Sequence, residues 1–483
     1  MSEARITWVG GPVLRACATG PFSIFEALAV GERRLLGEVI QLRGDELVAQ
    51  VYEDTTGLEP GVTVVGLERP LSVTLGPNLL GGIFDGLLRP LSRATDYQIQ
   101  PGAAERSVAR HRLEFAVRNG HVLSAGAVFA RTVAPRPQSL LVPPWASGRV
   151  EALVEPGEHR DDETLLVLVD DSGHRHELTM QHDWPVRRSR PVRERLGVNA
   201  PMITGQRILD TLFPVARGGR AALPGGFGTG KTVLQEALAK WCDADVIVYV
   251  GCGERGNEMA EVLDEFPQLE DPRTGRPLAE RTVIIANTSN MPVAAREASI
   301  YTAITVAEYF RDQGLNVALM ADSTSRWAEA LREVSGRLGE LPGEAGYPAY
   351  LSSRLAEFYE RAARVTSLAG AEGSVTIIGA ISPPSGDFSE PVTLHTKRYV
   401  RCFWALDRQR AQARFYPAIH PLQSYGSDVQ ELADWWKRSG NPDWLVQRQR
   451  VLELLEAQAH LERMARIVGR DALPAQQQVR LLC

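Results

Sequence analysis

The sequence predicts a multidomain protein in which two β-rich modules precede a large α/β domain and a helical segment follows it. The chain has 483 residues, more than a single domain usually contains. Hydrophobic residues make up 44% and charged residues 23%, values typical of a protein that buries several cores. The third observation is a change of pattern near residue 195, from short strand-like runs to buried strands that alternate with helices.

The composition argues against several classes of protein. A formal net charge of -6 argues against a nucleic-acid partner, which usually needs a basic face. The sequence has no run of about 18 apolar residues that could span a membrane, and no signal-peptide pattern at its N-terminus. The cysteines follow neither metal nor disulfide spacing: Cys17, Cys242, Cys252, Cys402 and Cys483. Such an odd, unpatterned set is typical of free thiols in a cytoplasmic protein.

Residues 1–70 are predicted to form an N-terminal β-barrel. Strand-like runs at 35–40 and 46–52 are separated by the turn sequence Arg43-Gly44-Asp45. A small barrel is the usual way to hide the edges of such short strands. Residues 71–110 are rich in Gly and Pro and predict a connector to the domains that follow.

Residues 111–186 are again β-like and predict a second β module inserted before the α/β domain. His174 and His176 could share one face of a strand, and together with His182 they could be interpreted as a metal cluster. Their spacing matches no zinc pattern and no cysteine lies nearby. We therefore interpret these three histidines, and His420, as surface or capping residues.

Residues 187–430 predict an α/β domain with a mostly parallel sheet. Its buried-strand runs include 246–250, 282–286, 317–320 and 375–378, and helical stretches such as 298–310 alternate with them. The domain opens on the basic run Arg187–Arg193. We favour a solvated or subunit-facing linker for this run over an anion site, because most runs of like charge are solvated.

Residues 431–483 are charged and predict a partial helical domain at the C-terminus. Its large apolar residues are expected to form one stripe along a helix: Leu452, Leu454, Leu455, Leu461 and Met464. Trp435 and Trp436 are interpreted as a packing pair rather than a ligand site.

One stretch carries most of the chemistry. The run Gly225-Gly226-Phe227-Gly228-Thr229-Gly230-Lys231-Thr232 matches the phosphate-binding P-loop pattern, with a short apolar run before it and an amphipathic helix after it. The glycines allow the backbone N–H groups to curl around a phosphate chain, which the N-terminus of the helix also attracts. Lys231 would reach the β and γ phosphates, and Thr232 would offer its hydroxyl to Mg²⁺. The sequence therefore predicts a site for a nucleotide and Mg²⁺.

Two carboxylates follow buried strands, where ligands bind in parallel sheets. Asp322 ends the apolar run 316–321 and is predicted to hold Mg²⁺, with a turn-capping role as the alternative. Glu254 follows the run 245–250 and could act as a general base on the attacking water. Spacing alone does not distinguish Glu254 from Glu258. Arg255 could steady Glu254 or a phosphate, or form a surface pair with Glu254.

The sequence resembles the catalytic A subunits of V/A-type rotary ATPases. The resemblance covers nearly the whole chain, and five blocks beside the P-loop carry it: 51–58, 250–259, 287–301, 320–333 and 381–393. It implies a β-barrel, a bulge insert, a RecA-like nucleotide-binding domain and a helical C-terminal domain. It also implies that Glu254 is the catalytic glutamate and that Tyr416, in Phe415-Tyr416-Pro417, stacks on the adenine of ATP or ADP.

The resemblance also implies partners and a place in the cell. Such A subunits alternate with B subunits in an A3B3 ring that contacts a central and a peripheral stalk. The ring lies on the cytoplasmic face of a membrane and is coupled to a sector that transports protons or sodium ions. The family continues beyond the position of Cys483, so we expect a shortened helical domain here. Two alternatives stay open: a non-catalytic or non-functional shortened paralogue in such a ring, and a secretion-type or helicase ATPase on the same core.

Overall fold

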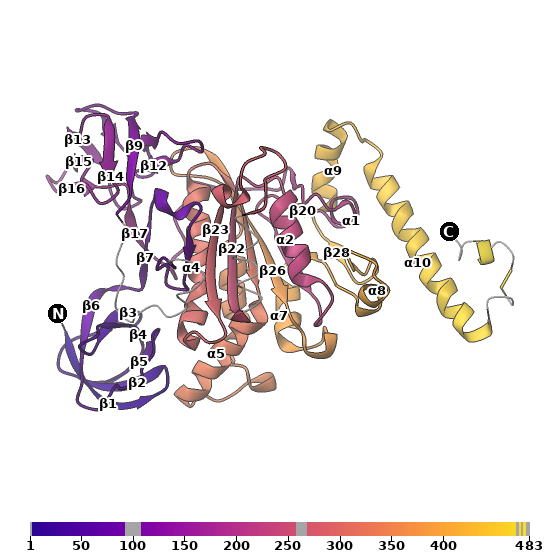
Figure 1. Cartoon of the computed structure of the whole chain (residues 1–483), viewed down its shortest axis with the longest axis horizontal. Coiled ribbons are helices and arrows are strands. Elements are labelled where there is room, and N and C mark those ends of the chain that lie inside the picture. Colours follow the sequence, from indigo (N-terminus) through magenta and orange to yellow (C-terminus); the bar gives the residue numbers. More distant parts are fainter. Residues whose placement is uncertain (1, 92–107, 257–267, 470–472, 475–476, 480–483) are drawn as a thin grey trace.

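A computed structural model describes residues 2–91, 108–256, 268–469, 473–474 and 477–479 of the chain (Figure 1). The N-terminal barrel and a second β-rich module lie at one end of the molecule, the α/β domain lies in the middle, and the last long helix extends from the other end. The predicted fold class is confirmed. None of the described helices combines the length and the low polarity that crossing a bilayer requires.

The first six strands close into an antiparallel barrel in the order β1-β2-β5-β4-β3-β6, because β6 pairs with β1. These strands are β1 (Glu3–Gly10), β2 (Val13–Ala18), β3 (Glu26–Val30), β4 (Leu35–Arg43), β5 (Glu46–Val51) and β6 (Thr63–Pro70). Their inward side chains form a separate core, which includes Ile6, Leu14, Leu28, Val39 and Val64. Closure pairs every edge, so the short strands need no further partner.

The second β module is two four-stranded sheets around a core of its own. One sheet has the order β10-β13-β15-β16: Val122–Leu123, Gly148–Leu153, Leu166–Val169 and Arg175–Leu178. The other has the order β12-β11-β9-β14: Ser139–Leu141, Val128–Thr132, Arg110–Phe115 and Gly157–Arg160. The chain enters and leaves this module through two paired strands, β7 (Ser72–Leu75) and β17 (His182–Pro185). The module is therefore an insert whose two ends are tied together.

The α/β domain is built on a large sheet whose middle strands are all parallel. Its main path is β28-β27-β21-β26-β24-β22-β23-β8. These strands are Tyr425–Gly426, Cys402–Phe403, Arg220–Pro224, Glu372–Ile381, Asn316–Asp322, Val246–Glu254, Thr282–Thr288 and Ile83–Phe84. β25 (Ala363–Thr366) and β18 (Glu194–Leu196) extend it, and β19 (Pro201–Met202) pairs with β20 (Val215–Ala216) beside it. Strand β22 runs to Glu254, past the predicted end at 250, because its pairing with β23 continues to Thr288.

Helices cover both faces of this sheet (Figure 1). They are α1 (Arg207–Leu212), α2 (Lys231–Trp241), α4 (Val293–Asp312), α5 (Thr324–Leu338), α6 (Leu351–Tyr359), α7 (Pro391–Tyr399) and α8 (Arg408–Gln412). Successive residues of β22 divide between two cores: Val246, Val248 and Val250 pack with α4–α7, whereas Ile247 and Tyr249 pack with α1 and α2. This follows from the alternation of side chains along a strand.

The expectation of a solvated basic linker at 187–193 is wrong for two of its arginines. Arg190 is buried, with its Nε 2.6 Å from Asp312 Oδ2, and the Arg187 side chain is 17% exposed between Glu38 and Glu297. Each guanidinium pairs with carboxylates of neighbouring elements, so desolvation is offset by charge. Sequence patterns do not reveal such partners, because they come from more than 100 residues away.

Two helices end the described chain, α9 (Val429–Arg438) and α10 (Trp444–Val468). The expected single apolar stripe on α10 is wrong: Leu461 is buried and Leu452 and Leu455 are half-buried, but Leu454 is 57% exposed and Met464 is 36% exposed. The reason is that α10 contacts α9 and α1 and then leaves the body of the molecule (Figure 1).

Candidate functional site

The P-loop joins the end of β21 to the start of α2, at the carboxyl edge of the parallel sheet. Gly228 and Gly230 have φ of 75° and 81°, a backbone conformation that side chains other than glycine rarely adopt. Thr229 is buried and donates a hydrogen bond of 2.8 Å from its hydroxyl to the Gly226 carbonyl, which holds the loop curled. The local sequence therefore sets the loop's shape before any ligand binds.

Asp322 is the centre of a small polar cluster under the P-loop. It ends β24, opposite Gly251 of β22, and is only 1% exposed. Lys231 Nζ lies 3.2 Å from its Oδ1, and the Thr232 hydroxyl donates to its Oδ2 at 3.2 Å. The Tyr249 hydroxyl donates to Oδ2 at 3.4 Å. Burial, reinforced by the negative charge of Asp322, raises the pKa of Tyr249 well above its usual value, so this hydroxyl stays a donor.

Sequence reasoning missed two residues of this cluster, Tyr249 and Ser382. Lys231 Nζ donates to the Ser382 hydroxyl, which follows the end of β26. Ser382 could have been found by the rule that led to Asp322, because it also follows a buried parallel strand. Tyr249 could not, because a tyrosine within an apolar run is usually core.

Glu254 and Arg255 lie at the end of β22 and line a cavity of about 480 Å³ with the P-loop. Lys231, Thr232 and Arg326 line the same cavity. The Arg255 guanidinium carbon is 5.5 Å from the centroid of the Phe227 ring, a cation–π contact that places Arg255 over the loop. The other candidate base, Glu258, lies outside the described residues. Nearby Cys252 is inert at neutral pH, because burial raises the pKa of its thiol to about 12.

Tyr416 lies at the other end of the P-loop. Its ring borders Gly230, where an added Cβ would be 3.3 Å from Tyr416 Cε1, and its hydroxyl donates to the Ala411 carbonyl at 3.3 Å. The ring is 60% exposed, so one face is open to a ligand. The structure thus gathers Lys231, Thr232, Glu254 and Arg255 around one cavity, with Asp322 beneath it and Tyr416 at the edge of the loop.

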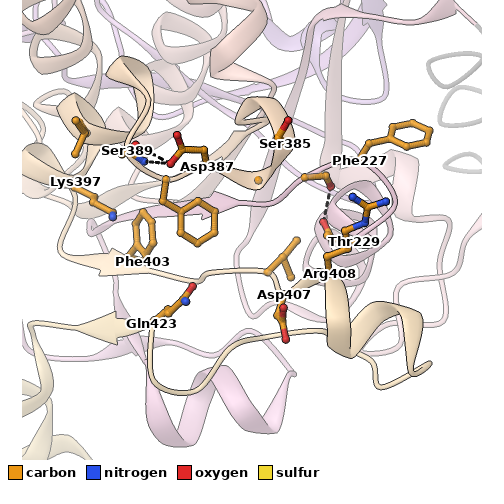
Figure 2. A pocket seen from close by; sticks show the side chains of 15 residues that line it. Phe227, Thr229, Ser385, Asp387, Ser389, Lys397, Phe403, Asp407, Arg408 and Gln423 are labelled. Carbon is orange, nitrogen blue, oxygen red and sulfur yellow. Dashed lines mark hydrogen bonds between the residues drawn. The ribbon is translucent and has the colours of Figure 1, made fainter. Parts of the chain in front are cut away.

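A second cavity, of about 870 Å³, lies beside the first (Figure 2). Gly226, Phe227 and Ser385 line both cavities. In the second, Asp387 accepts hydrogen bonds from the backbone and hydroxyl of Ser389, and Lys397 Nζ lies 4.7 Å from the centroid of the Phe403 ring. The loop that carries Ser385 and the first residues of the P-loop therefore form a shared wall.

The histidines identified in the sequence do not come together. His174 Nδ1 and His176 Nε2 lie 3.5 and 3.3 Å from Asp170 Oδ2. His182 instead accepts from Arg190, and burial together with the Arg190 charge lowers the pKa of His182 well below its usual value. His420 Nδ1 accepts the backbone N–H groups of Leu422 and Gln423, as expected for a capping residue.

The tryptophan pair is part of a larger packing cluster. The rings of Trp435 and Trp436 are perpendicular, with centroids 5.0 Å apart. Trp436 also stacks on Trp444 of α10 at 5.3 Å. These rings therefore hold α9 against α10.

Comparison with known proteins places the chain. Three family models match it: the ATP synthase alpha/beta family beta-barrel domain at 6–68, the ATP synthase alpha/beta subunit barrel-sandwich domain at 90–187, and the ATP synthase alpha/beta family nucleotide-binding domain at 205–426. The V-type ATP synthase alpha chain of Halothermothrix orenii is 52% identical over 486 residues. The chain belongs to the ATP synthase alpha/beta family. Within that family it is similar to the alpha chains, or A subunits, of V- and A-type ATP synthases.

The match to these ATP synthase proteins covers nearly all of this chain. The match to Halothermothrix orenii covers 99% of this chain and 82% of the relative. The corresponding A-type ATP synthase protein of Methanopyrus kandleri is 52% identical, covering 98% of this chain and 81% of the relative. The ATPase EscN of the enteropathogenic E. coli type III secretion system has a TM-score of 0.69 at 23% identity, over 99% of this chain and 92% of EscN. At that identity the likeness to EscN concerns the fold alone.

Proposed function

We propose that this chain is the catalytic nucleotide-binding subunit of a V/A-type rotary ATPase, where it hydrolyses or synthesises ATP. The observation that carries the proposal is the convergence of Lys231, Thr232 and Glu254 on one cavity above Asp322. Phosphoryl transfer needs a phosphate cradle, a carboxylate for the metal and a group that orients water, and these residues supply all three. The relatives named as ATP synthase proteins support the same function.

The substrate in this proposal is ATP or ADP. The P-loop, residues 225–232, binds the phosphates through its backbone N–H groups and the N-terminus of α2, and Lys231 adds a positive charge. Tyr416 stacks on the adenine through its open face, a contact worth about 1–3 kcal/mol. Glu254 and Tyr416 lie toward different ends of the P-loop, which suits a ligand with phosphates at one end and a base at the other.

The metal in this proposal is Mg²⁺, held by Thr232 and Asp322. A hydroxyl and a carboxylate oxygen are the hard ligands that Mg²⁺ prefers, and the two lie 3.2 Å apart, close enough to share one ion. When bound, Mg²⁺ neutralises charge on the phosphates. The Lys231–Asp322 pair keeps both side chains charged and at the site without the ligand.

Glu254 is the proposed general base. It orients the attacking water in line with the terminal phosphate and accepts its proton, while Arg255 steadies the phosphates beside it. A non-catalytic paralogue could dispense with both Lys231 and Glu254, so their presence favours a catalytic role. A secretion-type ATPase is supported only by the likeness of fold to EscN.

The proposal includes an assembly. The chain alternates with B subunits in an A3B3 ring, which contacts a central and a peripheral stalk on the cytoplasmic face of a membrane. A membrane sector then couples the reaction to transport of protons or sodium ions. In this assembly we assign residues 1–70 to the barrel, 71–110 to the connector, 111–186 to the bulge insert, 187–430 to the RecA-like domain and 431–483 to the helical end.

Changing Lys231 to Ala tests the nucleotide site. It removes a charge-assisted contact worth about 1.5–3 kcal/mol, so we expect Mg-ATP to bind roughly 10- to 150-fold more weakly. It also leaves Asp322 without its ammonium partner beside the phosphates. Calorimetry on the purified chain measures the affinity. Lys240→Ala, at the far end of α2, is the matched control and should bind as the wild type does. Equal affinities for all three proteins would contradict the assignment.

A further inference from the structure

We propose that Arg187 is a positioning residue for the catalytic groups, acting through helix α4 from the junction between the barrel and the α/β domain. This inference rests on the proposed function, because it concerns the residues that perform the proposed reaction. It assigns a role to the basic run that the nucleotide site does not explain.

Arg187 joins three parts of the chain at one buried point. Its Nη1 and Nη2 donate to both carboxylate oxygens of Glu297 on α4, at 3.0 and 2.9 Å. Nη2 also donates to Glu38 Oε2 of barrel strand β4, at 3.0 Å. Its guanidinium carbon lies 4.9 Å from the centroid of the Tyr301 ring, one turn further along α4. Because the fork is bidentate and the ring lies beside it, the N-terminal part of α4 is held in one orientation relative to the barrel.

The surroundings keep this contact charged. Burial lowers the pKa of Arg187, but Glu297, Tyr52 and Glu38 outweigh that effect and raise it well above its usual value. Without the guanidinium, Glu38 and Glu297 would be two buried carboxylates with like charge. They would separate or take up protons, and α4 would lose its attachment to the barrel.

The held part of α4 contacts both strand ends that carry the chemistry. The Glu297 carbonyl accepts the Trp327 indole N–H at 3.1 Å, and Trp327 is fully buried in the first turns of α5, which begins two residues after Asp322. Arg296, the neighbour of Glu297, packs on Gly253, where an added Cβ would lie 2.7 Å from Arg296 Cδ. Gly253 directly precedes Glu254. A shift of α4 therefore moves the surroundings of Glu254 and of Asp322 together.

The P-loop lies outside this path. It belongs to β21 and α2, and α2 packs on the other face of the sheet with a different core. Loss of Arg187 should therefore disturb the chemical step more than the binding of nucleotide. That separation distinguishes a positioning role from a role in stability alone.

The test compares Arg187→Gln and Arg187→Lys with Arg190→Gln. Arg190 is a matched control because it belongs to the same run and is equally paired, but it contacts Asp312 at the opposite end of α4. In the assembled complex we expect Arg187→Gln to lower kcat about 10- to 100-fold with unchanged KM, as small misplacements of reacting groups do. Arg187→Lys keeps one contact and should restore part of the rate. Arg190→Gln should lower Tm but leave kcat unchanged.

A second readout does not depend on activity. In the purified chain, Arg187→Gln should speed amide hydrogen exchange at residues 251–255 and 323–328, well below its Tm, whereas Arg190→Gln should not. Equal exchange and equal kcat in both glutamine variants would overturn the inference. If the wild-type complex does not hydrolyse ATP, the proposed function fails, and the exchange experiment still decides whether Arg187 positions these strand ends.

Discussion

Replacing Glu254 by glutamine is expected to lower ATP turnover by about 10²–10⁴-fold while Mg-ATP still binds. Glutamine keeps the size of the side chain at the end of β22 but cannot accept a proton from water. The phosphate contacts come from the P-loop and Lys231, and Asp322 lies on another strand, so binding should remain near the wild-type level. The measurement is steady-state hydrolysis by the assembled complex, with calorimetric binding to the same variant.

Glu329→Gln is the control for this experiment. Glu329 is a carboxylate of α5 near the same cavity, and it pairs with Arg326 at 2.9 Å without lining the cavity. Its loss should change turnover little. A Glu254→Gln complex that hydrolyses ATP at the wild-type rate would move the role of base to another carboxylate, and Glu258 would be the first to test.

Adding the partner B subunit is expected to raise the ATP turnover of the isolated chain by about 10³–10⁵-fold. P-loop enzymes gain this factor from an arginine that reaches the transferring phosphate from a neighbouring protein. The two arginines of this chain that line the cavity have other contacts: Arg255 lies over Phe227, and Arg326 binds Glu329. Neither is therefore assigned the role of the arginine supplied in trans.

The measurement is single-turnover hydrolysis by the chain alone and after titration with the partner. A complex made with the Lys231→Ala chain serves as the control and should gain little, because its own site no longer holds the nucleotide firmly. If the lone chain already turns over at the rate of the complex, no arginine from a neighbour is needed, and the proposed alternating ring loses its chemical reason.

Much of the fold could be predicted because it depends on local pattern. Runs such as 246–250 are apolar on both faces, which only a strand covered by helices on each side can bury, and β22 occupies that place. The P-loop could be predicted because glycine at 228 and 230 permits the positive φ that the curled backbone needs. Asp322 could be predicted because an acidic residue at the end of a buried strand is rarely accidental beside such a loop.

Other features depend on partners that are distant in sequence, and pattern alone does not reveal them. The apolar residues of α10 have a helical spacing, but whether a neighbour covers them depends on where the helix leaves the body. Tyr249 has the sequence context of a core residue, yet its hydroxyl reaches Asp322 from the neighbouring strand.

The sequence by itself determined the order of the modules, the nucleotide loop and the strand ends that carry Glu254 and Asp322, because each is specified by residues close together in the chain. Only the tertiary structure decided what the charged residues between the modules do. Arg187 and Arg190 belong to one basic run, but one holds the N-terminal part of α4 and the other its C-terminal end. Burial of a charge is tolerated only where an opposite charge meets it, and that meeting is a property of the folded chain.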